Sequence, residues 1–307
     1  AALRTGCTER LVTPAETADA IGEMLHSTGE AAIPAPIAGN DPLQALFTRL
    51  YARTEVAFAD YKRATFLRRL ERRQNACGVG SLEGYLEFTE RHPEELDLLR
   101  QDLLISVTSF FRDGPAYEIL GAELHKRFAT RPAVQRFRVW VPGCATGEEV
   151  YSLAILMAEA LGEEFGPHRC QIFATDIDEN AMKVARRGVY AAKSLRSLDA
   201  ARIREHFRSV TDGMEISQRI RDVVVFSRHD LTKDPPFGRV DLISCRNVLI
   251  YFDVETKRTV LSHVRKVLRP GGFLVLGGAE STLNLDGAFQ RTELSKAVVF
   301  RHSGGAA

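Results

Sequence analysis

The sequence of 307 residues has no long hydrophobic run, only five cysteines and almost no net charge. No apolar stretch approaches the roughly 18 residues that a membrane-spanning helix needs, so we expect none. The cysteines are scattered and form no CxxC pair or Cys/His cluster, which argues against a disulfide framework and a zinc site. We therefore expect no metal and a reducing, cytoplasmic compartment. A net charge of +1 gives no overall field that would attract nucleic acid or an anionic membrane.

The first 40 residues are predicted to be a tail and a linker. The chain starts without Met and without a signal-peptide pattern, so we expect a fragment of a longer protein. A helical pattern covers residues 15–25, and residues 31–40 are rich in Pro, Ala and Gly, a composition typical of an extended linker.

The rest of the chain is long enough for two domains. Residues 41–130 carry helical patterns with Pro and Gly at the helix boundaries, which predicts a small all-α domain. Strand and helix patterns alternate over residues 131–307, which predicts an α/β domain with a Rossmann-like parallel sheet. Asp212 and Gly213 separate two short strand-like runs, so a β-hairpin insertion is expected at about 205–222. The strands of the sheet are expected at 137–141, 171–175, 223–227, 241–245, 273–276 and 297–301, and the helices at 148–161, 179–187 and 254–268.

Three apolar runs, at residues 139–149, 173–178 and 241–252, end in small or polar residues. In an open parallel sheet such strand ends line a shared crevice where ligands bind. The dinucleotide-binding fingerprint G-x-G-x-x-G has three glycines. The first turn here has only Gly143 and Gly147, which disfavours a dinucleotide-dependent oxidoreductase.

The same turn places Glu148 and Glu149 at a helix N-terminus, where carboxylates repel a pyrophosphate but suit a ligand with a positive group. The competing interpretation is that the two acids only complement the helix dipole. Asp176, at the end of the second run, is placed to accept hydrogen bonds from ribose hydroxyls, and Asp178 is the better candidate for a helix cap. A ligand with a ribose, an adjacent positive charge and no pyrophosphate describes S-adenosylmethionine.

Two later strand ends would complete this crevice. Asp230 and Leu231 are placed to bracket an adenine ring, and Arg246 and Asn247 would bring polar groups to the crevice after an apolar strand. The alternative for Arg246 is an ion pair between domains.

Five blocks of the sequence follow one another in a specific order: residues 104–113 (LISVTSFFRD), 145–152 (ATGEEVYS), 174–178 (ATDID), 245–253 (CRNVLIYFD) and 268–273 (LRPGGF). These blocks resemble the CheR family of chemotaxis receptor methyltransferases, and the resemblance covers about residues 42–301. It implies a helical N-terminal domain joined to a Rossmann-like methyltransferase domain. It also implies O-methylation of glutamate side chains on cytoplasmic chemoreceptor helices, with S-adenosyl-L-methionine as cofactor and S-adenosyl-L-homocysteine as product.

The resemblance assigns the cofactor contacts residue by residue. It implies that Ser106, Thr108 and Arg112 contact the methionine portion, although family members often carry Asn where Ser106 stands. It places Glu148 at the amino group, with the neighbouring Glu149 as an open alternative, and Asp176 at the ribose. The remaining contacts that it implies are Asp230 and Leu231 at the adenine, with Gly143, Arg246 and Asn247 completing the pocket.

The chemistry needs no nucleophile supplied by the enzyme. A glutamate carboxylate is already ionised near neutral pH, so it can attack a methyl sulfonium without a general base. Catalysis is then mainly the alignment of the reacting groups with water excluded. Tyr251 matches a tyrosine that the family places near the transferred methyl, and we expect Arg112 and Tyr251 to position the substrate carboxylate.

Residues 62–73 contain six basic side chains and one acid. On a helix, Lys62, Arg68, Arg69, Arg72 and Arg73 fall in an arc of roughly 140°. A charge run of this kind is commonly a solvated face. The resemblance instead implies that it docks on the acidic methylation helices of a chemoreceptor, with substrate contacts from Lys62, Arg69, Arg72 and Arg73.

Two further expectations concern partners. The tight turn at 211–213 is typical of family members that do not bind a receptor's C-terminal pentapeptide tether. Residues 1–16 resemble the end of a chemotaxis methylesterase domain, which implies a fused or associated methylesterase module; an unrelated Ala/Thr-rich tail is the alternative. Because fold does not fix substrate, a cofactor-binding sensor or scaffold, or a methyltransferase with another protein acceptor, also stays open.

Overall fold

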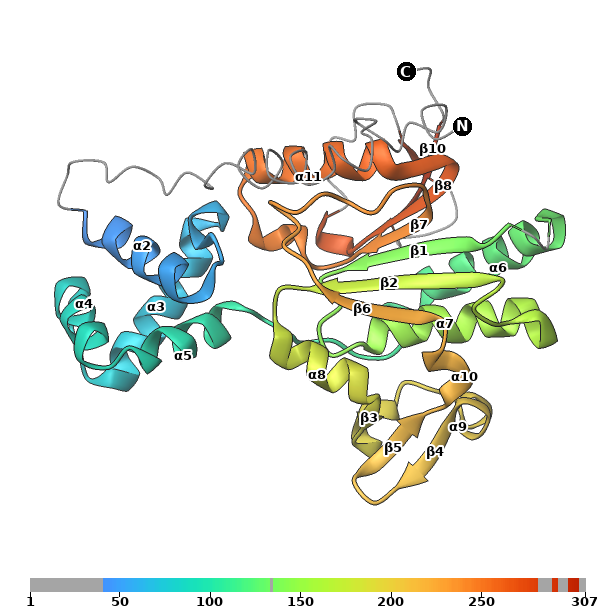
Figure 1. The fold of residues 1–307 in the computed structure, drawn as a ribbon, viewed down its shortest axis with the longest axis horizontal. Coiled ribbons are helices and arrows are strands. Elements are labelled where there is room, and N and C mark those ends of the chain that lie inside the picture. The colour runs from blue at the N-terminus through green and yellow to red at the C-terminus, as the bar shows by residue number, and fades with distance from the viewer. Residues whose placement is uncertain (1–40, 133–134, 281–288, 292–297, 304–307) are drawn as a thin grey trace, which may run out of the picture. The chain divides into compact units, whose positions relative to one another are not determined.

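The computed structural model describes residues 41–132, 135–280, 289–291 and 298–303 (Figure 1). The helix expected at 15–25 and the linker after it lie outside these residues. Within the described ranges, no helix combines the length and apolar character needed to cross a membrane.

The N-terminal part consists of helices around one small core. The helices are α2 (Pro42–Thr54), the 3₁₀ turn η2 (Phe58–Asp60), α3 (Arg63–Cys77), α4 (Leu82–Arg91) and α5 (Glu94–Leu103). Leu46, Leu50 and Phe66 are almost fully buried in this core. Gly78 ends α3 in the left-handed conformation, and the Ser81 hydroxyl caps α4 by accepting a hydrogen bond from the Gly84 N–H at 3.1 Å. The predicted all-α character is confirmed for these helices, whereas α6 (Gly114–Thr130), which was expected in the same domain, packs into the core of the α/β part.

The α/β part contains a seven-stranded sheet in the order β6-β2-β1-β7-β8-β10-β9. The pairs from β6 to β8 are parallel, whereas β10 runs antiparallel to β8 and β9 antiparallel to β10. Its strands are β1 (Phe137–Pro142), β2 (Cys170–Asp176), β6 (Val224–Arg228), β7 (Val240–Cys245), β8 (Leu268–Leu276), β9 (Phe289–Arg291) and β10 (Val298–His302). The predicted parallel sheet is confirmed, and β9 and β10 add an antiparallel edge.

Helices cover both faces of the sheet (Figure 1). Alternate residues of β1 point to opposite faces: Val139 and Val141 join the apolar cluster that includes residues of α6 and α7, whereas Trp140 joins the cluster on the α11 side. This burial on both faces explains the near-continuous apolar runs in the sequence. The helices are α6 (Gly114–Thr130), α7 (Glu148–Leu161), α8 (Glu179–Arg187) and α11 (Val254–Val267), with 3₁₀ turns η3 (Gly162–Glu164), η4 (Ala192–Leu195), η5 (Leu249–Tyr251) and η6 (Gly278–Glu280).

A small antiparallel sheet is inserted between α8 and β6. It consists of β3 (Val189–Tyr190), β4 (Phe207–Val210) and β5 (Gly213–Ile216), and it is flanked by α9 (Ala200–His206) and α10 (Gln218–Arg221). The predicted hairpin is confirmed as the β4–β5 pair, and β3 is an additional strand that the sequence did not indicate. Gly213 has a φ of +143°, and a Cβ there would lie 2.4 Å from the Tyr190 carbonyl oxygen, so this turn requires glycine.

Candidate active site

A cavity of about 270 Å³ opens at the carboxyl ends of the central strands. Its walls include the ends of β1, β2 and β7, and the strand order reverses between β1 and β7, which is where open α/β sheets bind ligands. The segment between α2 and α3 adds Val56, Ala57 and Tyr61, and the segment between α5 and α6 adds residues 103–108.

Most of the predicted site residues line this one cavity. They come from five separate segments of the chain, which only the fold brings together. The predicted residues that line it are Ser106, Thr108, Arg112, Gly143, Asp176, Asp230, Leu231, Arg246, Asn247 and Tyr251.

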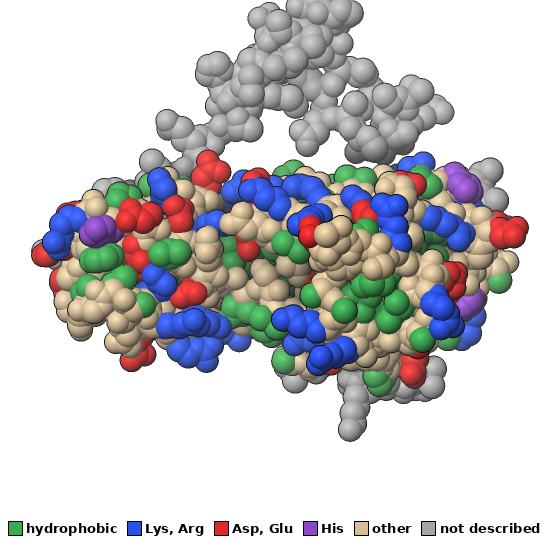
Figure 2. Space-filling view, turned by 90° about the horizontal axis from the view of Figure 1, so that it is seen from below, with side chains coloured by type: hydrophobic (Ala, Val, Ile, Leu, Met, Phe, Trp, Pro, Cys, Tyr) green, Lys and Arg blue, Asp and Glu red, His purple; other side chains and the backbone are tan. Residues whose placement is uncertain are grey.

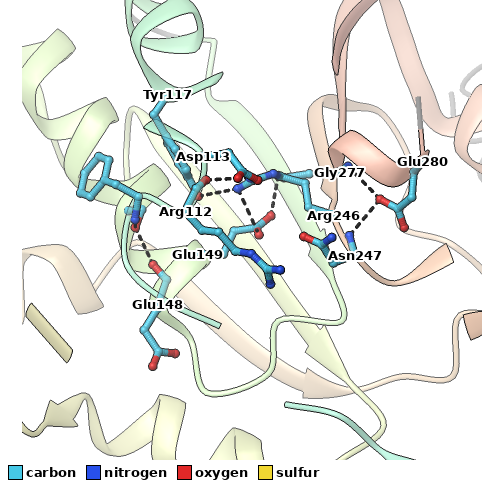
Figure 3. Close-up of polar contacts among 12 residues, drawn as sticks. Arg112, Asp113, Tyr117, Glu148, Glu149, Arg246, Asn247, Gly277 and Glu280 are labelled. Carbon is cyan, nitrogen blue, oxygen red and sulfur yellow. Dashed lines mark hydrogen bonds and ion pairs between the residues drawn. The ribbon is translucent and has the colours of Figure 1, made fainter. Parts of the chain in front are cut away.

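The first turn of α7 presents Glu149, not Glu148, to the cavity. The Ser244 hydroxyl donates a hydrogen bond to Glu149 Oε1 at 2.6 Å, and Arg246 Nη1 lies 3.6 Å from Oε2. Burial raises the pKa of Glu149, while the Arg246 cation and the Ser244 hydrogen bond oppose that rise. Figure 3 shows Glu149 directed toward Arg246 and the carboxylate of Glu148 directed away from it.

The expectation that Glu148 lines the site is therefore corrected. Consecutive residues of a helix point about 100° apart, so only one of the two acids can face the cavity. Glu148 is buried elsewhere, where its carboxylate accepts a hydrogen bond from the Thr146 hydroxyl at 2.6 Å. Burial raises the pKa of this carboxyl group.

Asp176 joins the end of β2 to the turn after β1. Its carboxylate accepts hydrogen bonds from the backbone N–H groups of Ala145 and Asp178, both at 2.8 Å. Ala145 has a φ of +48°, a conformation that is uncommon outside glycine and is held here by this contact. Burial raises the pKa of Asp176, although its two hydrogen bonds oppose that rise. Asp178 caps α8 by accepting from the Asn180 N–H, as expected.

Arg246 connects the end of β7 to the start of α6 (Figure 3). Its Nη2 donates to the Arg112 carbonyl oxygen at 2.7 Å and to Asp113 Oδ2 at 2.6 Å, and Nη1 donates to the Tyr117 hydroxyl at 3.2 Å. The side chain is 2% exposed. Arg246 thus forms an ion pair with Asp113, the N-cap of α6, within the α/β part, so it is not the ion pair between domains that the alternative interpretation expected. Arg246 also lines the cavity.

Glu280 shapes the loop after β7, and the sequence did not indicate this role. Its buried carboxylate accepts hydrogen bonds from three backbone N–H groups, those of Asn247 (2.8 Å), Gly277 (2.7 Å) and Ile250 (3.2 Å). Asn247 has a φ of +59°, so the loop takes a strained turn that Glu280 holds in place. The available sequence signal was an acid a few residues after the end of an apolar strand.

Arg112 and Tyr251 meet the cavity from opposite parts of the chain. Arg112 is exposed and donates from Nη1 to the Val107 carbonyl oxygen at 3.3 Å. Partial burial raises the pKa of Tyr251, so its phenol is a neutral hydrogen-bond donor near pH 7.

The start of α3 is attached to the Tyr251 loop by backbone contacts, which we call the 60–62/251–253 bridge. The Lys62 N–H donates to the Tyr251 carbonyl oxygen at 2.7 Å, and the Asp253 N–H donates to the Asp60 carbonyl oxygen at 3.1 Å. Between them, Tyr61 pairs with Phe252 as an antiparallel bridge, and their rings meet edge to face. The bridge fixes the predicted basic helix beside Tyr251.

The predicted substrate-binding residues of α3 are in different environments. Lys62 is exposed, the Arg72 side chain is 66% exposed, and Arg69 is half-buried. Arg73 is only 18% exposed and forms a bidentate ion pair with Glu95 at 2.8 and 2.7 Å. The structure therefore places Arg73 in a partly buried ion pair that links α3 to α5. Figure 2 shows that Lys and Arg side chains gather in several patches on one face of the molecule.

Comparison with known families identifies the class of protein. The family model described as "CheR methyltransferase, all-alpha domain" matches residues 41–104. The model described as "CheR methyltransferase, SAM binding domain" matches residues 106–298. The fold and site are thus those of an S-adenosylmethionine-dependent methyltransferase. The chain belongs to the CheR methyltransferase family.

Individual relatives agree with this assignment. The chain is 34% identical to the chemotaxis protein methyltransferase of Salmonella typhimurium, over 77% of this chain and 82% of that protein. It is 33% identical to chemotaxis protein methyltransferase 2 of Pseudomonas aeruginosa, over 81% and 91% of the two chains. An uncharacterized 104.1 kDa protein of Rhodobacter capsulatus is 39% identical over 76% of this chain, which spans only 25% of that protein's length.

A solved methyltransferase structure also resembles part of this chain. The magnesium protoporphyrin IX methyltransferase ChlM from Synechocystis PCC 6803, with bound SAM, covers 60% of this chain and 76% of its own length. The identity is 18% and the TM-score 0.34, a likeness that carries no argument about function.

The residues present fit S-adenosylmethionine, the cofactor of the matched domain. Glu149 offers a carboxylate to a cationic amino group, and Asp176 and Asp230 offer carboxylates at neighbouring strand ends. Leu231 and Phe252 add apolar surface to the same cavity. A mostly preformed cavity with a few convergent polar groups is the usual form of a cofactor site.

Proposed function

We propose that this chain transfers a methyl group from S-adenosylmethionine to glutamate side chains on the cytoplasmic helices of chemoreceptor proteins. The observation that carries the proposal is that the cofactor cavity, Arg112, Tyr251 and the basic helix α3 form one continuous arrangement joined by the 60–62/251–253 bridge. The chemotaxis methyltransferases among the relatives support the same substrate class.

The proposal assigns each cavity residue to a part of the cofactor. Glu149 would hold the amino group, Asp176 the ribose, and Asp230 with Leu231 the adenine. Bound S-adenosylmethionine supplies an electrophilic methyl group on a sulfonium. The residues that would complete its pocket are Ser106, Thr108, Arg112, Gly143, Arg246 and Asn247.

The chain's own residues would act by positioning. The substrate glutamate is ionised near pH 7, so no residue needs to remove a proton from it. The Arg112 guanidinium and the neutral Tyr251 phenol would orient its carboxylate oxygens toward the methyl group. Tyr61 and the neighbouring wall residues would exclude water, which strengthens these polar contacts and prevents hydrolysis.

The proposed partner is an acidic receptor helix that docks on α3. Lys62, Arg69 and Arg72 present positive charge there, and complementary charge guides association more than it adds affinity. A cytoplasmic location follows from this partner. We extend the proposal to a fused or associated methylesterase module, and the much longer Rhodobacter capsulatus relative supports a multidomain context.

Radiolabelled methyl transfer tests the proposal. The chain is incubated with labelled S-adenosylmethionine and cytoplasmic fragments of chemoreceptors, and the label is tested for release by mild base, as expected for a methyl ester. Binding of S-adenosylhomocysteine is measured in parallel by calorimetry. Tight binding without a base-labile methyl group on any fragment would overturn the proposal in favour of a cofactor-binding sensor.

A further inference from the structure

The side chains of Lys62 and Lys257 lie close together near the loop that carries Tyr251, and neither forms an ion pair among the described residues. Lys62 is the N-cap of α3, and Lys257 lies in the first turns of α11, where its N–H donates to the Asp253 carbonyl oxygen at 3.2 Å. Among the described residues, no carboxylate oxygen lies within 4.0 Å of either ammonium group. Partial burial and the neighbouring Lys62 ammonium lower the pKa of Lys257, and the more distant carboxylates of Glu280 and Asp253 only partly oppose this effect.

The fold holds this pair of like charges together. The 60–62/251–253 bridge joins the chain at the N-terminus of α3 to the chain at the N-terminus of α11, so the backbone keeps the two lysines in neighbouring positions. Two cations in contact repel each other, and an anion between them relieves that repulsion. The arrangement is therefore prepared for an anionic group from outside.

Arg69 is a further cation near Tyr251, and one of its hydrogen-bond donors has no partner among the described residues. Arg69 is half-buried, and its Nε has no hydrogen-bond partner among the described residues although that atom is buried. Arg112 and Arg69 both act on the pKa of Tyr251 in the lowering direction, against the larger effect of burial. If Arg112 and Tyr251 hold the target glutamate, the lysine pair is left for a different carboxylate.

The geometry points to a second carboxylate subsite: Lys62 and Lys257 bind an acidic side chain of the substrate one helical turn away from the methylated glutamate. Side chains three or four residues apart on a helix are about 5–6 Å apart. The Lys62 N–H donates to the Tyr251 carbonyl oxygen at 2.7 Å, so the lysine pair lies next to the residue proposed to position the target glutamate, within reach of the next turn of a docked helix. This inference rests on the proposed function and adds a sequence preference around the target glutamate, with Lys257 as a specificity-determining residue.

The test compares two versions of a receptor fragment that accepts methyl in the experiment above. One version keeps an acidic residue three or four positions from the target glutamate, and the other carries Gln there. The enzymes are the unaltered chain, Lys257→Gln, and Arg258→Gln as a matched control that removes one exposed charge from the same helix.

The unaltered chain should methylate the acidic fragment about tenfold more efficiently in kcat/KM, mainly through KM, which is the usual size of one charge-assisted hydrogen bond. Lys257→Gln should lose this preference and Arg258→Gln should keep it, with S-adenosylhomocysteine affinity equal in all three. Lys257→Glu should prefer a fragment with Lys at the flanking position, which a general loss of structure could not produce.

Equal preference for the acidic fragment in the unaltered chain and in Lys257→Gln would overturn the subsite while leaving the proposed function intact. If no fragment of any receptor accepts methyl, the proposed function itself fails, and the subsite fails with it. The two failures are distinguished by whether the unaltered chain transfers methyl at all.

Discussion

Glu280 offers a direct test of how the cavity is built, because one buried carboxylate holds the loop that follows β7. Its oxygens accept from three backbone N–H groups, and Gly277 gives it room, since a Cβ there would lie 2.9 Å from Glu280 Oε2. The same loop carries Asn247 and Tyr251 to the cavity. Removing the carboxylate should therefore affect stability and cofactor binding together.

The magnitude follows from the hydrogen bonds. A hydrogen bond to a charged group contributes about 1.5–3 kcal/mol, but solvation of the freed N–H groups and relaxation of the loop recover part of this. Glu280→Ala should thus lower the free energy of unfolding by about 4 kcal/mol. Glu280→Gln keeps the shape of the side chain, but its amide NH₂ group would face a backbone N–H donor. We therefore expect the free energy of unfolding to fall by about 2 kcal/mol.

Urea unfolding measures the stability, and calorimetry with S-adenosylhomocysteine measures the affinity, which should fall at least tenfold in Glu280→Ala. Glu255→Ala, an exposed acid on α11, is the matched control and should change the free energy of unfolding by less than about 0.5 kcal/mol. A Glu280→Ala protein as stable as the control, with unchanged affinity, would refute the role assigned to this carboxylate.

Three further predictions follow from the site and the core. Glu149→Gln should weaken S-adenosylhomocysteine binding about tenfold or more in calorimetry, whereas a larger effect from Glu148→Gln would contradict the cavity geometry. Arg73→Ala should lower the free energy of unfolding by about 2–3 kcal/mol, because it leaves buried Glu95 unpaired, and Arg72→Ala by less than about 0.5 kcal/mol; equal urea midpoints would disprove this difference. Burial lowers the pKa of His206 below its ordinary 6.5, so the unfolded chain binds a proton more readily, and stability should fall as pH drops below about 6.5. The urea midpoint of His206→Phe should fall less between about pH 7.5 and about pH 5.5, and a parallel fall in both proteins would exclude His206 as the cause.

The sequence predicted the sheet because its central strands are buried on both faces and are therefore apolar throughout. Strand β8 shows the limit of this argument. The Pro270–Gly272 turn suggested that a strand begins at Phe273, yet β8 starts at Leu268 because Leu268 pairs with Val240 across an irregularity in the ladder. That pairing depends on a residue far away in the chain. The two-residue strand β3 was missed for the same reason.

The sequence predicted site residues well where a motif lies at the end of a strand. It did not predict which of two neighbouring side chains points into the cavity. Asp176 and Arg246 were expected at strand ends and line the cavity. The choice between Glu148 and Glu149 depends on the phase of α7 relative to the sheet, which the motif does not contain. The hydrogen bonds of Glu280 and the contact between Tyr61 and Phe252 depend on segments distant in sequence. An acid shortly after an apolar strand was the only local signal for Glu280, and it did not identify the partners of that acid.

The boundary between the two family domains passes through the wall of the cavity. The helical match ends at residue 104 and the SAM-binding match begins at 106, while residues 103–108 all line the cavity together with Val56, Ala57 and Tyr61. Neither domain alone therefore contains a complete cofactor site. Exchange of the helical domain between relatives would alter the cofactor pocket as well as the docking helix, so the two domains are expected to evolve as a single inherited unit.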